Sequence, residues 1–461
     1  MEGESSMGVS AGIFRQYDIR GIVGADLTVE AATAIGRSYA SLMRERSVTG
    51  AIVVSRDNRP SGDMLRDALV AGLTSSGVDV VDIGVVPTPL NYWALNNLTV
   101  AGGIQITGSH NPPEYNGFKL SMGRSSLHGD EIQHLYQLMQ RPINGAKSGR
   151  VTSQQVIDRY IDDVVARTGP LPSTMRVVYD CGNGAGALVA PQLMKRLGIQ
   201  ARGLFCESDG TFPNHHPDPT VPENLADLIT AVKKDGAQIG IAFDGDADRI
   251  GIVDEDGTII WGDRILIVYA RDVLARTGTG QPIIFDVKCS QALTDAIENA
   301  GGKPVMWKTG HSLIKDKMKE TNAPVAGEMS GHMFFSEGFY GHDDALYGAA
   351  RLLKILAASK ETIKEALSDV PAYVSTPEIR IEVPEELKFS LVAKAVAHFR
   401  ARHDVIDVDG VRVLFGDGWG LIRASNTQPV IVARYEALTA DRLASIRGEM
   451  EGWLRAQGVK V

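Results

Sequence analysis

The 461-residue chain has few cysteines and no excess of positive charge. Its three cysteines are odd in number and form no C-x-x-C pair, so neither a disulfide framework nor a zinc site is expected, and a reducing compartment is favoured. The formal net charge of −9 argues against nucleic acid as the main partner. A small anionic ligand is still compatible, because a local basic pocket can lie inside an acidic protein.

Long apolar runs are also missing. No stretch approaches the roughly 18 continuous apolar residues of a membrane span. The segment from Met1 to Ile13 carries no Lys or Arg and no long apolar run, so a signal peptide is not expected. We therefore expect no membrane partner and a location in the cytoplasm.

The overall composition is ordinary for a soluble globular protein, with 44% hydrophobic and 22% charged residues. A hydrophobic core of normal size is expected. At about 150 residues per domain, the length predicts roughly three domains.

Three segments of the chain repeat one strand–helix–strand plan. In each, a short β-branched or aromatic run leads to an aspartate, at Asp57, Asp180 and Asp286. A helix-period stretch follows and stops near a glycine, over 64–75, 185–197 and 291–299. A second strand comes next, over 78–83, 201–205 and 303–307. The repetition predicts three related α/β domains with mixed sheets.

A different pattern starts after Pro371. A strand-like run over 378–383 and a helix-like run over 389–400 come first, and the remaining elements are expected over 419–423, 430–435 and 441–454. These last three are two strands and an amphipathic helix. The pattern predicts a smaller C-terminal α+β domain. We place the four domains at 1–150, 151–258, 259–370 and 371–461.

The first repeat contains the unusual loop T-G-S-H-N-P-P at 107–113, after a strand-like run. Gly, Ser, Asn and Pro favour a tight, exposed turn. Ser109 on such a turn can present its hydroxyl as a nucleophile, and a plain polar loop is the alternative. No G-x-S-x-G surrounds Ser109, so a Ser-His-Asp hydrolase is not indicated.

The second repeat contains D-G-D-A-D-R at 244–249, also after a strand-like run. Asp244, Asp246 and Asp248 would repel one another unless a cation lies between them, and their hard oxygen ligands suit Mg²⁺ or Ca²⁺. A solvated acidic turn is the alternative. An EF-hand does not fit, because Arg249 stands where that loop needs Gly and the flanks are strands.

Two further loops carry polar groups. The third repeat has G-E-M-S-G-H at 327–332, whose acceptor, hydroxyl and imidazole suit hydrogen bonding to a sugar. The last domain has R-A-S-N-T-Q-P at 423–429, whose guanidinium, hydroxyls and backbone amides could hold a phosphate. Taken alone, each loop is also compatible with a plain polar connection.

In this order the four loops resemble those of the α-D-phosphohexomutase superfamily, and most of all its phosphomannomutase/phosphoglucomutase branch. The likeness covers nearly the whole chain, from F-R-Q-Y-D-I-R-G at 14–21 to the loop at 423–429. It implies four domains around one deep central cleft, each supplying one loop. Three repeats followed by a different fourth domain agree with that plan.

The resemblance also implies a role for each site residue. Ser109 would be the phosphoserine and would hold Mg²⁺ together with Asp244, Asp246 and Asp248. The residues implied in substrate binding are Tyr17, Lys288, His311, Glu328, Ser330, Arg423, Ser425, Asn426 and Thr427. The residues implied in catalysis are Ser109, Lys119, Arg20, His332 and Arg249.

The implied reaction moves phosphate reversibly between positions 1 and 6 of a glucose or mannose phosphate, through the phosphoserine and a hexose 1,6-bisphosphate that is intermediate and activator. Lys119, Arg20 and His332 are candidates for moving the hydroxyl proton. Lys119 or His332 is preferred, because the pKa of an arginine lies above about 12. The phosphosugar is the expected partner, and the chain is expected to act as a monomer.

Three alternatives are weighed against this reaction. A phosphoglucosamine mutase usually has Gln where this chain has Met329. A sugar-phosphate phosphatase would pass the phosphate of Ser109 to water, but Asp248 replaces the Thr of a D-x-D-x-T nucleophile motif. A non-catalytic sensor would be expected to have lost catalytic residues, and none is missing. The sequence does not distinguish glucose from mannose as the preferred sugar.

Overall fold

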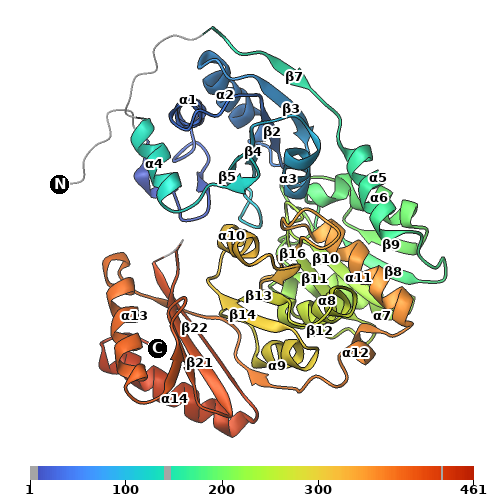
Figure 1. Ribbon diagram of the computed structural model, residues 1–461, viewed down its shortest axis with the longest axis vertical. Coiled ribbons are helices and arrows are strands. Elements are labelled where there is room, and N and C mark those ends of the chain that lie inside the picture. The colour runs from blue at the N-terminus through green and yellow to red at the C-terminus, as the bar shows by residue number, and fades with distance from the viewer. Residues whose placement is uncertain (1–8, 140–146, 427–428) are drawn as a thin grey trace.

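The computed structural model describes residues 9–139, 147–426 and 429–461 (Figure 1). Four sheets follow one another along this part of the chain, each accompanied by helices. The sheets that combine parallel and antiparallel strands confirm the α/β class expected from the sequence. In Figure 1 the C-terminal domain, orange to red, lies beside β13 and β14 of the third sheet.

The first three sheets share one four-stranded core. In the first sheet its spatial order is β5 (Tyr115–Met122), β4 (Gly102–Ile106), β2 (Ile52–Arg56) and β3 (Val80–Val85). In the second it is β11 (Ile250–Asp254), β10 (Ile239–Phe243), β8 (Arg176–Asp180) and β9 (Gln200–Leu204). In the third it is β16 (Met333–Phe335), β15 (Val325–Gly327), β13 (Pro282–Asp286) and β14 (Lys303–Trp307).

Strand direction is the same in all three cores. The last three strands of each order run parallel to one another, and the strand named first runs antiparallel to its neighbour. The strand–helix–strand repetition expected from the sequence is therefore a real repetition of topology. Its buried runs of Val, Ile and Phe fit strands covered on both faces.

Additional strands extend the first two sheets. They are β1 (Ile19–Ile22), β6 (Ser125–Ser126) and β7 (Val151–Ser153) in the first and β12 (Ile259–Ile260) in the second. The helical elements up to the end of the second sheet are η1 (Ala11–Ile13), α1 (Val29–Glu45), α2 (Gly62–Ser75), α3 (Thr88–Asn97), α4 (Asp130–Leu138), α5 (Ile157–Thr168), η2 (Ala185–Leu188), α6 (Ala190–Leu197), η3 (Pro222–Leu225) and α7 (Ala226–Asp235). Those that accompany the third sheet are α8 (Gly262–Thr277), α9 (Gln291–Asn299), α10 (His311–Thr321), α11 (Ala345–Ser359) and α12 (Ile363–Ala366).

The prediction of one of the helices is wrong in detail. The stretch 185–197 forms the short η2 and then α6 rather than one continuous helix. Pro191 lies in the first turn of α6, where its missing amide hydrogen costs nothing. Farther inside a helix, the proline ring would clash with the preceding turn, so the helix restarts just before it.

The C-terminal domain is built on an antiparallel sheet. Its strands are β17 (Val374–Ser375), β18 (Ile379–Glu382), β19 (Asp404–Ile406), β20 (Val411–Leu414), β21 (Gly418–Ala424) and β22 (Val430–Ala437). Two helices, α13 (Glu385–Arg400) and α14 (Ala440–Ala456), pack against β20 to β22. Helix α13 begins four residues before the expected start at 389, because Glu385 and Glu386 suit the first turn after Pro384.

The apolar cores show which domains are joined most closely. The C-terminal domain has a core of its own, and α1, α2 and α4 form a separate core with one face of the first sheet. The second and third sheets share one continuous core, which α8 and α11 help to fill and which extends into the first domain at α3 and the other face of its sheet. The loops at the ends of these two sheets are therefore held on one rigid base.

Candidate functional site

Three of the four loops singled out in the sequence occupy the same position in the repeated fold. The loops at 107–114, 244–249 and 328–332 join β4 to β5, β10 to β11 and β15 to β16. Each therefore connects the third parallel strand of its core to the antiparallel strand beside it. This shared position explains why chemically different loops converge at one place.

Ser109 lies at the junction between the first and second loops. Its side chain is almost fully buried, and its Oγ donates to Asp244 Oδ2 at 3.1 Å and lies 3.1 Å from His110 Nδ1. The backbone of Ser109 has a φ of 49°, in the left-handed region that few residues other than glycine adopt. Its amide donates to Thr107 Oγ1 at 2.8 Å, which helps to hold this conformation.

Arg59, which the sequence did not single out, holds the serine loop from behind. Its Nη2 donates to the carbonyls of Ser109 and Asn111 at 2.8 and 2.6 Å. Its Nη1 donates to the carbonyls of Pro112 and Tyr115 at 2.5 and 3.0 Å. One guanidinium therefore fixes four backbone carbonyls, and the only signal for it was its place two residues after the repeated Asp57.

Asp57 completes this support. Its Oδ2 accepts hydrogen bonds from Thr107 Oγ1 at 2.7 Å, from the amide of Gly108 at 3.1 Å and from Arg59 Nε at 3.2 Å. Asp286, its counterpart in the third repeat, accepts from the amide of Met329 at 2.9 Å. A buried aspartate at the end of the first strand thus binds the neighbouring loop in two of the repeats.

We expect the Arg59→Lys variant to keep the fold and to lose roughly 10- to 100-fold in kcat, because small misplacements of a reacting group cost this much. A lysine has three donors on one atom and cannot span four carbonyls as a planar guanidinium does. Steady-state kinetics with circular dichroism as a fold check would measure this. Arg56→Lys is the matched control, since Arg56 pairs with Asp63 instead; equal turnover in both variants would contradict the supporting role.

The three aspartates of the second loop face one another. Asp244, Asp246 and Asp248 are fully buried, and each offers a carboxylate oxygen within 4.8 Å of the others. Asp246 Oδ1 and Asp248 Oδ1 are buried without a hydrogen-bond partner among the described residues. Gly245 allows the serine loop to approach, because a Cβ there would lie 2.4 Å from the carbonyl oxygen of Ser109. Buried, unpartnered carboxylate oxygens fit a hard divalent cation.

The charges of this cluster are unequal. Burial, together with the neighbouring Asp248 and Asp246, raises the pKa of Asp244 well above its usual value. Burial also opposes ionisation of Asp246, but Lys119 and the hydroxyl of Thr88 outweigh it and lower the pKa of Asp246. The cluster therefore attracts positive charge more strongly than isolated aspartates would.

Lys119 supplies part of that positive charge from β5. Its Nζ lies 3.0 Å from Asp246 Oδ2 and also pairs with Asp248 Oδ2. Burial alone would lower the pKa of Lys119, but these two carboxylates hold it well above its usual value. A buried ion pair thus joins β5, the strand that follows the serine loop in the first domain, to the aspartate loop of the second domain.

The second and third loops also meet. Arg249 forms a β-bridge with His332, and Arg249 Nε donates to His332 Nε2 at 3.0 Å. Gly331 permits this contact, because its φ is 95° and a Cβ there would lie 2.4 Å from the carbonyl oxygen of Ile250. Since Nε2 of His332 accepts this bond, its neutral ring carries the proton on Nδ1.

Asp343, which the sequence also missed, lies behind His332. Its Oδ2 is 3.4 Å from His332 Nδ1 and 3.7 Å from His311 Nδ1. Its Oδ1 pairs with Lys315 Nζ at 3.0 Å. Burial opposes the charge on Asp343, but Lys315 and the two histidines hold its pKa well below the usual value. A single carboxylate therefore faces two predicted site histidines.

Glu328 and Ser330 share the third loop. Glu328 is buried, its Oε1 accepts from the amide of Gly310 at 2.6 Å, and burial raises its pKa. Ser330 is partly exposed in the turn closed by the hydrogen bond from the Gly331 amide to the Glu328 carbonyl, at 3.0 Å. Gly310 directly precedes His311 at the start of α10. The third loop therefore lies against the predicted site residue His311.

The C-terminal loop is linked to the first and third domains through Tyr17. Asn426 Nδ2 donates to the hydroxyl of Tyr17 at 2.6 Å, and this hydroxyl donates to the carbonyl of Thr309 at 2.6 Å. Arg423 Nε donates to Asp409 Oδ2 at 2.9 Å. Ser425 is mostly buried, and Thr427 lies outside the described residues. Tyr17 thus connects the first, third and C-terminal domains.

Two more predicted residues take part in contacts between segments. Arg20 Nη1 donates to Asn111 Oδ1 in the serine loop at 2.6 Å, and Arg20 Nη2 pairs with Asp18 at 2.5 Å. Lys288 Nζ pairs with Glu378 of the C-terminal domain at 2.5 Å. Burial opposes the charge on Lys288, but Glu378 and Asp286 outweigh it and raise its pKa. All the predicted site residues within the described part of the chain therefore lie on the converging loops or on segments that contact them.

Comparison with known proteins decides the family. The chain matches all four domains of phosphoglucomutase/phosphomannomutase, the alpha/beta/alpha domains I, II and III over residues 11–144, 158–257 and 261–373 and the C-terminal domain over 378–452. The chain belongs to this family. The expectation of a phosphohexomutase relationship is thus confirmed.

Relatives of this phosphoglucomutase/phosphomannomutase family member match over almost their whole length. It is 47% identical over 450 residues to the phosphomannomutase/phosphoglucomutase of Pseudomonas aeruginosa, covering 97% of this chain and 96% of that one. It is 46% identical to the phosphoglucomutase of Neisseria gonorrhoeae, covering 96% of each chain. A crystal structure of a family protein from Burkholderia thailandensis superposes with a TM-score of 0.90 at 44% identity, covering 97% of this chain and 98% of that one.

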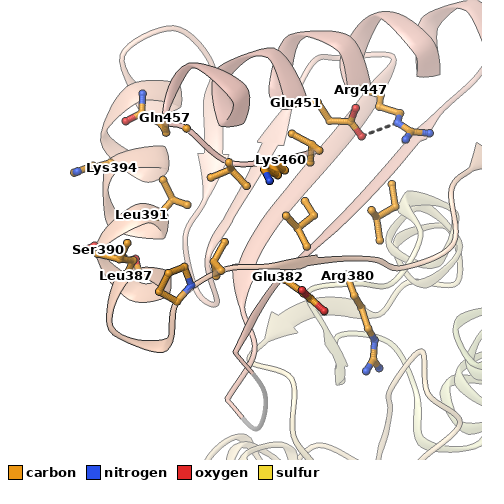
Figure 2. Close-up of a pocket in the computed structure, with 17 residues that line it drawn as sticks. Arg380, Glu382, Leu387, Ser390, Leu391, Lys394, Arg447, Glu451, Gln457 and Lys460 are labelled. Carbon is orange, nitrogen blue, oxygen red and sulfur yellow. Dashed lines mark hydrogen bonds and ion pairs between the residues drawn. The ribbon is translucent and has the colours of Figure 1, made fainter.

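A cavity of about 710 Å³ opens elsewhere in this family member, within the C-terminal domain (Figure 2). It lies between β18, α13, α14 and the last residues of the chain, and Arg447 pairs with Glu451 beside it. None of the described site residues lines it. Across residues 9–139, 147–426 and 429–461, no helix has both the length and the apolar character needed to cross a bilayer.

Proposed function

We propose that this protein transfers a phosphoryl group reversibly between O1 and O6 of a hexose phosphate, through phosphorylated Ser109 and a hexose 1,6-bisphosphate. The observation that carries the proposal is the contact of Ser109 Oγ with Asp244 at 3.1 Å, inside a buried cluster of carboxylates and cations. The names of the relatives from Pseudomonas aeruginosa and Neisseria gonorrhoeae support glucose phosphates, and the first also supports mannose phosphates.

The reaction consists of two transfers. In the first, the bond between phosphorus and Ser109 Oγ breaks while a bond forms from phosphorus to the free hydroxyl of the sugar phosphate, and the hydroxyl proton leaves. The bisphosphate then turns over within the site. In the second, its other phosphoryl group returns to Ser109, and the released sugar carries phosphate at the opposite end. Phosphoryl transfer of this kind depends mainly on positioning and on stabilising charge.

Asp244, Asp246 and Asp248 are the residues that would hold Mg²⁺, with an oxygen of phosphorylated Ser109 as a further ligand. Their two unpartnered carboxylate oxygens support this assignment. When bound there, Mg²⁺ polarises the transferring phosphoryl group and neutralises charge. The guanidinium of Arg249 adds positive charge beside Asp244, whose carboxylate helps to raise the pKa of Arg249 against the effect of burial.

Lys119 is our choice for moving the proton of the sugar hydroxyl. His332 is less available, because Nε2 accepts from Arg249 and the protonated Nδ1 faces Asp343. Asp246 and Asp248, which keep Lys119 protonated, are also proposed metal ligands. A metal held by these carboxylates would share their charge with Lys119 and would weaken the attraction that raises the pKa of Lys119. Arg20 acts as a charge partner of phosphate, because it cannot give up its proton.

The remaining residues bind the rest of the substrate. Glu328 and Ser330 accept and donate hydrogen bonds to sugar hydroxyls. Arg423, Ser425, Asn426 and Thr427 hold the phosphate that is not reacting, and Tyr17, Lys288 and His311 line the same place. Contacts limited to equivalent hydroxyls and one phosphate site allow the bisphosphate to bind in either direction. Movement of the C-terminal domain, which carries that phosphate site, would exclude water during transfer.

We also propose the wider setting of the enzyme. The domains divide near residues 150, 258 and 370, and each supplies one of the four loops. The protein acts as a monomer in the cytoplasm, where hexose phosphates are the small anionic partners that its buried cations fit.

The test is an assay of purified protein for conversion of glucose 1-phosphate and mannose 1-phosphate to their 6-phosphates, with Mg²⁺ and a trace of glucose 1,6-bisphosphate. We expect both sugars to be converted and a chelator to stop both reactions. Release of free phosphate without isomerisation would indicate a phosphatase instead. Conversion of glucosamine phosphate alone would move the protein to the phosphoglucosamine mutases.

A further inference from the structure

Two of the three cysteines lie side by side, although they are 25 residues apart in the sequence. Cys181 follows β8 and Cys206 follows β9, and these parallel strands are neighbours in the second sheet. Their sulfur atoms are 3.4 Å apart. A disulfide bond is about 2.05 Å long, so bond formation requires the two sulfurs to approach by roughly 1.4 Å.

We propose that Cys181 and Cys206 form a reversible disulfide when the enzyme meets a hydroperoxide, which makes the pair a covalent modification site distinct from the phosphoryl-transfer residues. The inference goes beyond the proposed function. It rests on the sulfur geometry and on the contacts of the two cysteine loops. Cys289, the third cysteine, has no part in it, because its buried thiol donates to Asp286 Oδ1 at 3.0 Å.

The surroundings make Cys206 the attacking thiol. Cys181 is fully buried, whereas Cys206 is partly exposed and can be reached by a small oxidant. Gly203 leaves room for the sulfur, since a Cβ there would lie 2.5 Å from Cys206 Sγ. The contacts of Cys206 with the thiol of Cys181 and with Tyr179 lower the pKa of Cys206 against the effect of burial. The same pairing and burial raise the pKa of Cys181.

The chemistry balances with the peroxide as the oxidant. The Cys206 thiolate attacks one peroxide oxygen, the O–O bond breaks, and a sulfenic acid and hydroxide form. The Cys181 sulfur then attacks the sulfenic sulfur, an S–S bond forms, and the sulfenic oxygen leaves as water with the thiol proton. Two thiols lose two electrons, and one hydrogen peroxide becomes two waters. A reducing thiol reverses the change by exchange.

The two cysteine loops also contact the site, so the bond should affect turnover. The amide of Ala185, four residues after Cys181, donates to the carbonyl of Gly245 in the aspartate loop at 2.8 Å. Asn58 Nδ2 donates to the carbonyl of Asn183 at 2.7 Å and to Ser208 Oγ at 2.9 Å. Asn58 directly precedes Arg59, which holds the serine loop. A movement of the sulfurs is therefore passed to both reacting loops.

The test uses full-length enzyme, reduced, desalted and then treated with hydrogen peroxide. We expect free thiols to fall from three to one, a Cys181–Cys206 cross-linked peptide under non-reducing conditions, and a turnover lower by roughly tenfold. Dithiothreitol should reverse all three changes. The Cys206→Ser variant should show no cross-link and no reversible loss, whereas Cys289→Ser should still form the cross-link.

Two outcomes would overturn the proposed disulfide. The first is a Cys206 sulfinic acid without any cross-link. The second is a disulfide that involves Cys289 or joins two chains. A Cys181–Cys206 cross-link with unchanged turnover would support the disulfide and overturn only its expected effect on the reacting loops. The cross-link and the number of free thiols are measured without any substrate. Failure of the disulfide proposal is therefore distinguishable from failure of the proposed function.

Discussion

Ser109→Ala is expected to lower kcat by roughly 10⁴-fold or more, since it removes the oxygen that carries the phosphoryl group. The loss should be the same for glucose 1-phosphate and mannose 1-phosphate, because both transfers pass through Ser109. The fold should be unaffected, because the side chain's hydrogen bonds are to Asp244 and His110 at the site itself. Coupled spectrophotometric assay of both sugars measures the effect.

A second readout separates the phosphoryl carrier from a residue that only binds. Incubation with glucose 1,6-bisphosphate should add the mass of one phosphoryl group to the wild-type protein and none to Ser109→Ala. Ser125→Ala is the matched control in the same domain, because Ser125 is exposed and bonds to Lys319. A Ser109→Ala protein that still takes up phosphate would place the carrier elsewhere.

Lys119→Ala is expected to lower kcat by roughly 10²- to 10⁴-fold, which is the range for loss of a proton-transfer group. The change also removes the cation that pairs with Asp246 and Asp248. Some of the loss could therefore come from the charge of the lysine rather than from proton transfer. Kinetics of this variant alone would not tell the two apart.

Lys119→Arg separates these two contributions. Arginine keeps the positive charge for the two aspartates but cannot accept a proton near neutral pH. If proton transfer is the task of Lys119, both variants should be similarly slow. Recovery of most of the activity in Lys119→Arg would show that charge suffices, and near-normal turnover of Lys119→Ala would exclude Lys119 as the proton-transfer group.

The repeated architecture could be read from the sequence because its signals are local. Each buried run, such as the strands that lead to Asp57 and Asp286, is followed by a helix-period stretch and a second run. The structure confirms three cores with one topology. The prediction of one helix over 185–197 was wrong only around Pro191. A proline is tolerated in the first turn of a helix but not farther inside it, so α6 begins just before Pro191.

The candidate site was predicted in part for the same reason. The loops around Ser109, Asp244 and Glu328 are continuous in sequence, so the composition of each loop already indicates its chemistry. Arg59 and Asp343 were missed, because each comes from another segment and carries no local signature. Their significance appears only in the contacts that they make with the serine loop and with His332.

The sequence by itself therefore determined the repeated α/β units, the chemical character of each loop and the resemblance that led to the family. The tertiary structure decided which groups face one another. It places Lys119 between two aspartates, Arg249 against His332, and Cys181 beside Cys206. The physical reason is that such contacts depend on strand order and on how sheets meet, and a local pattern of residues does not record either.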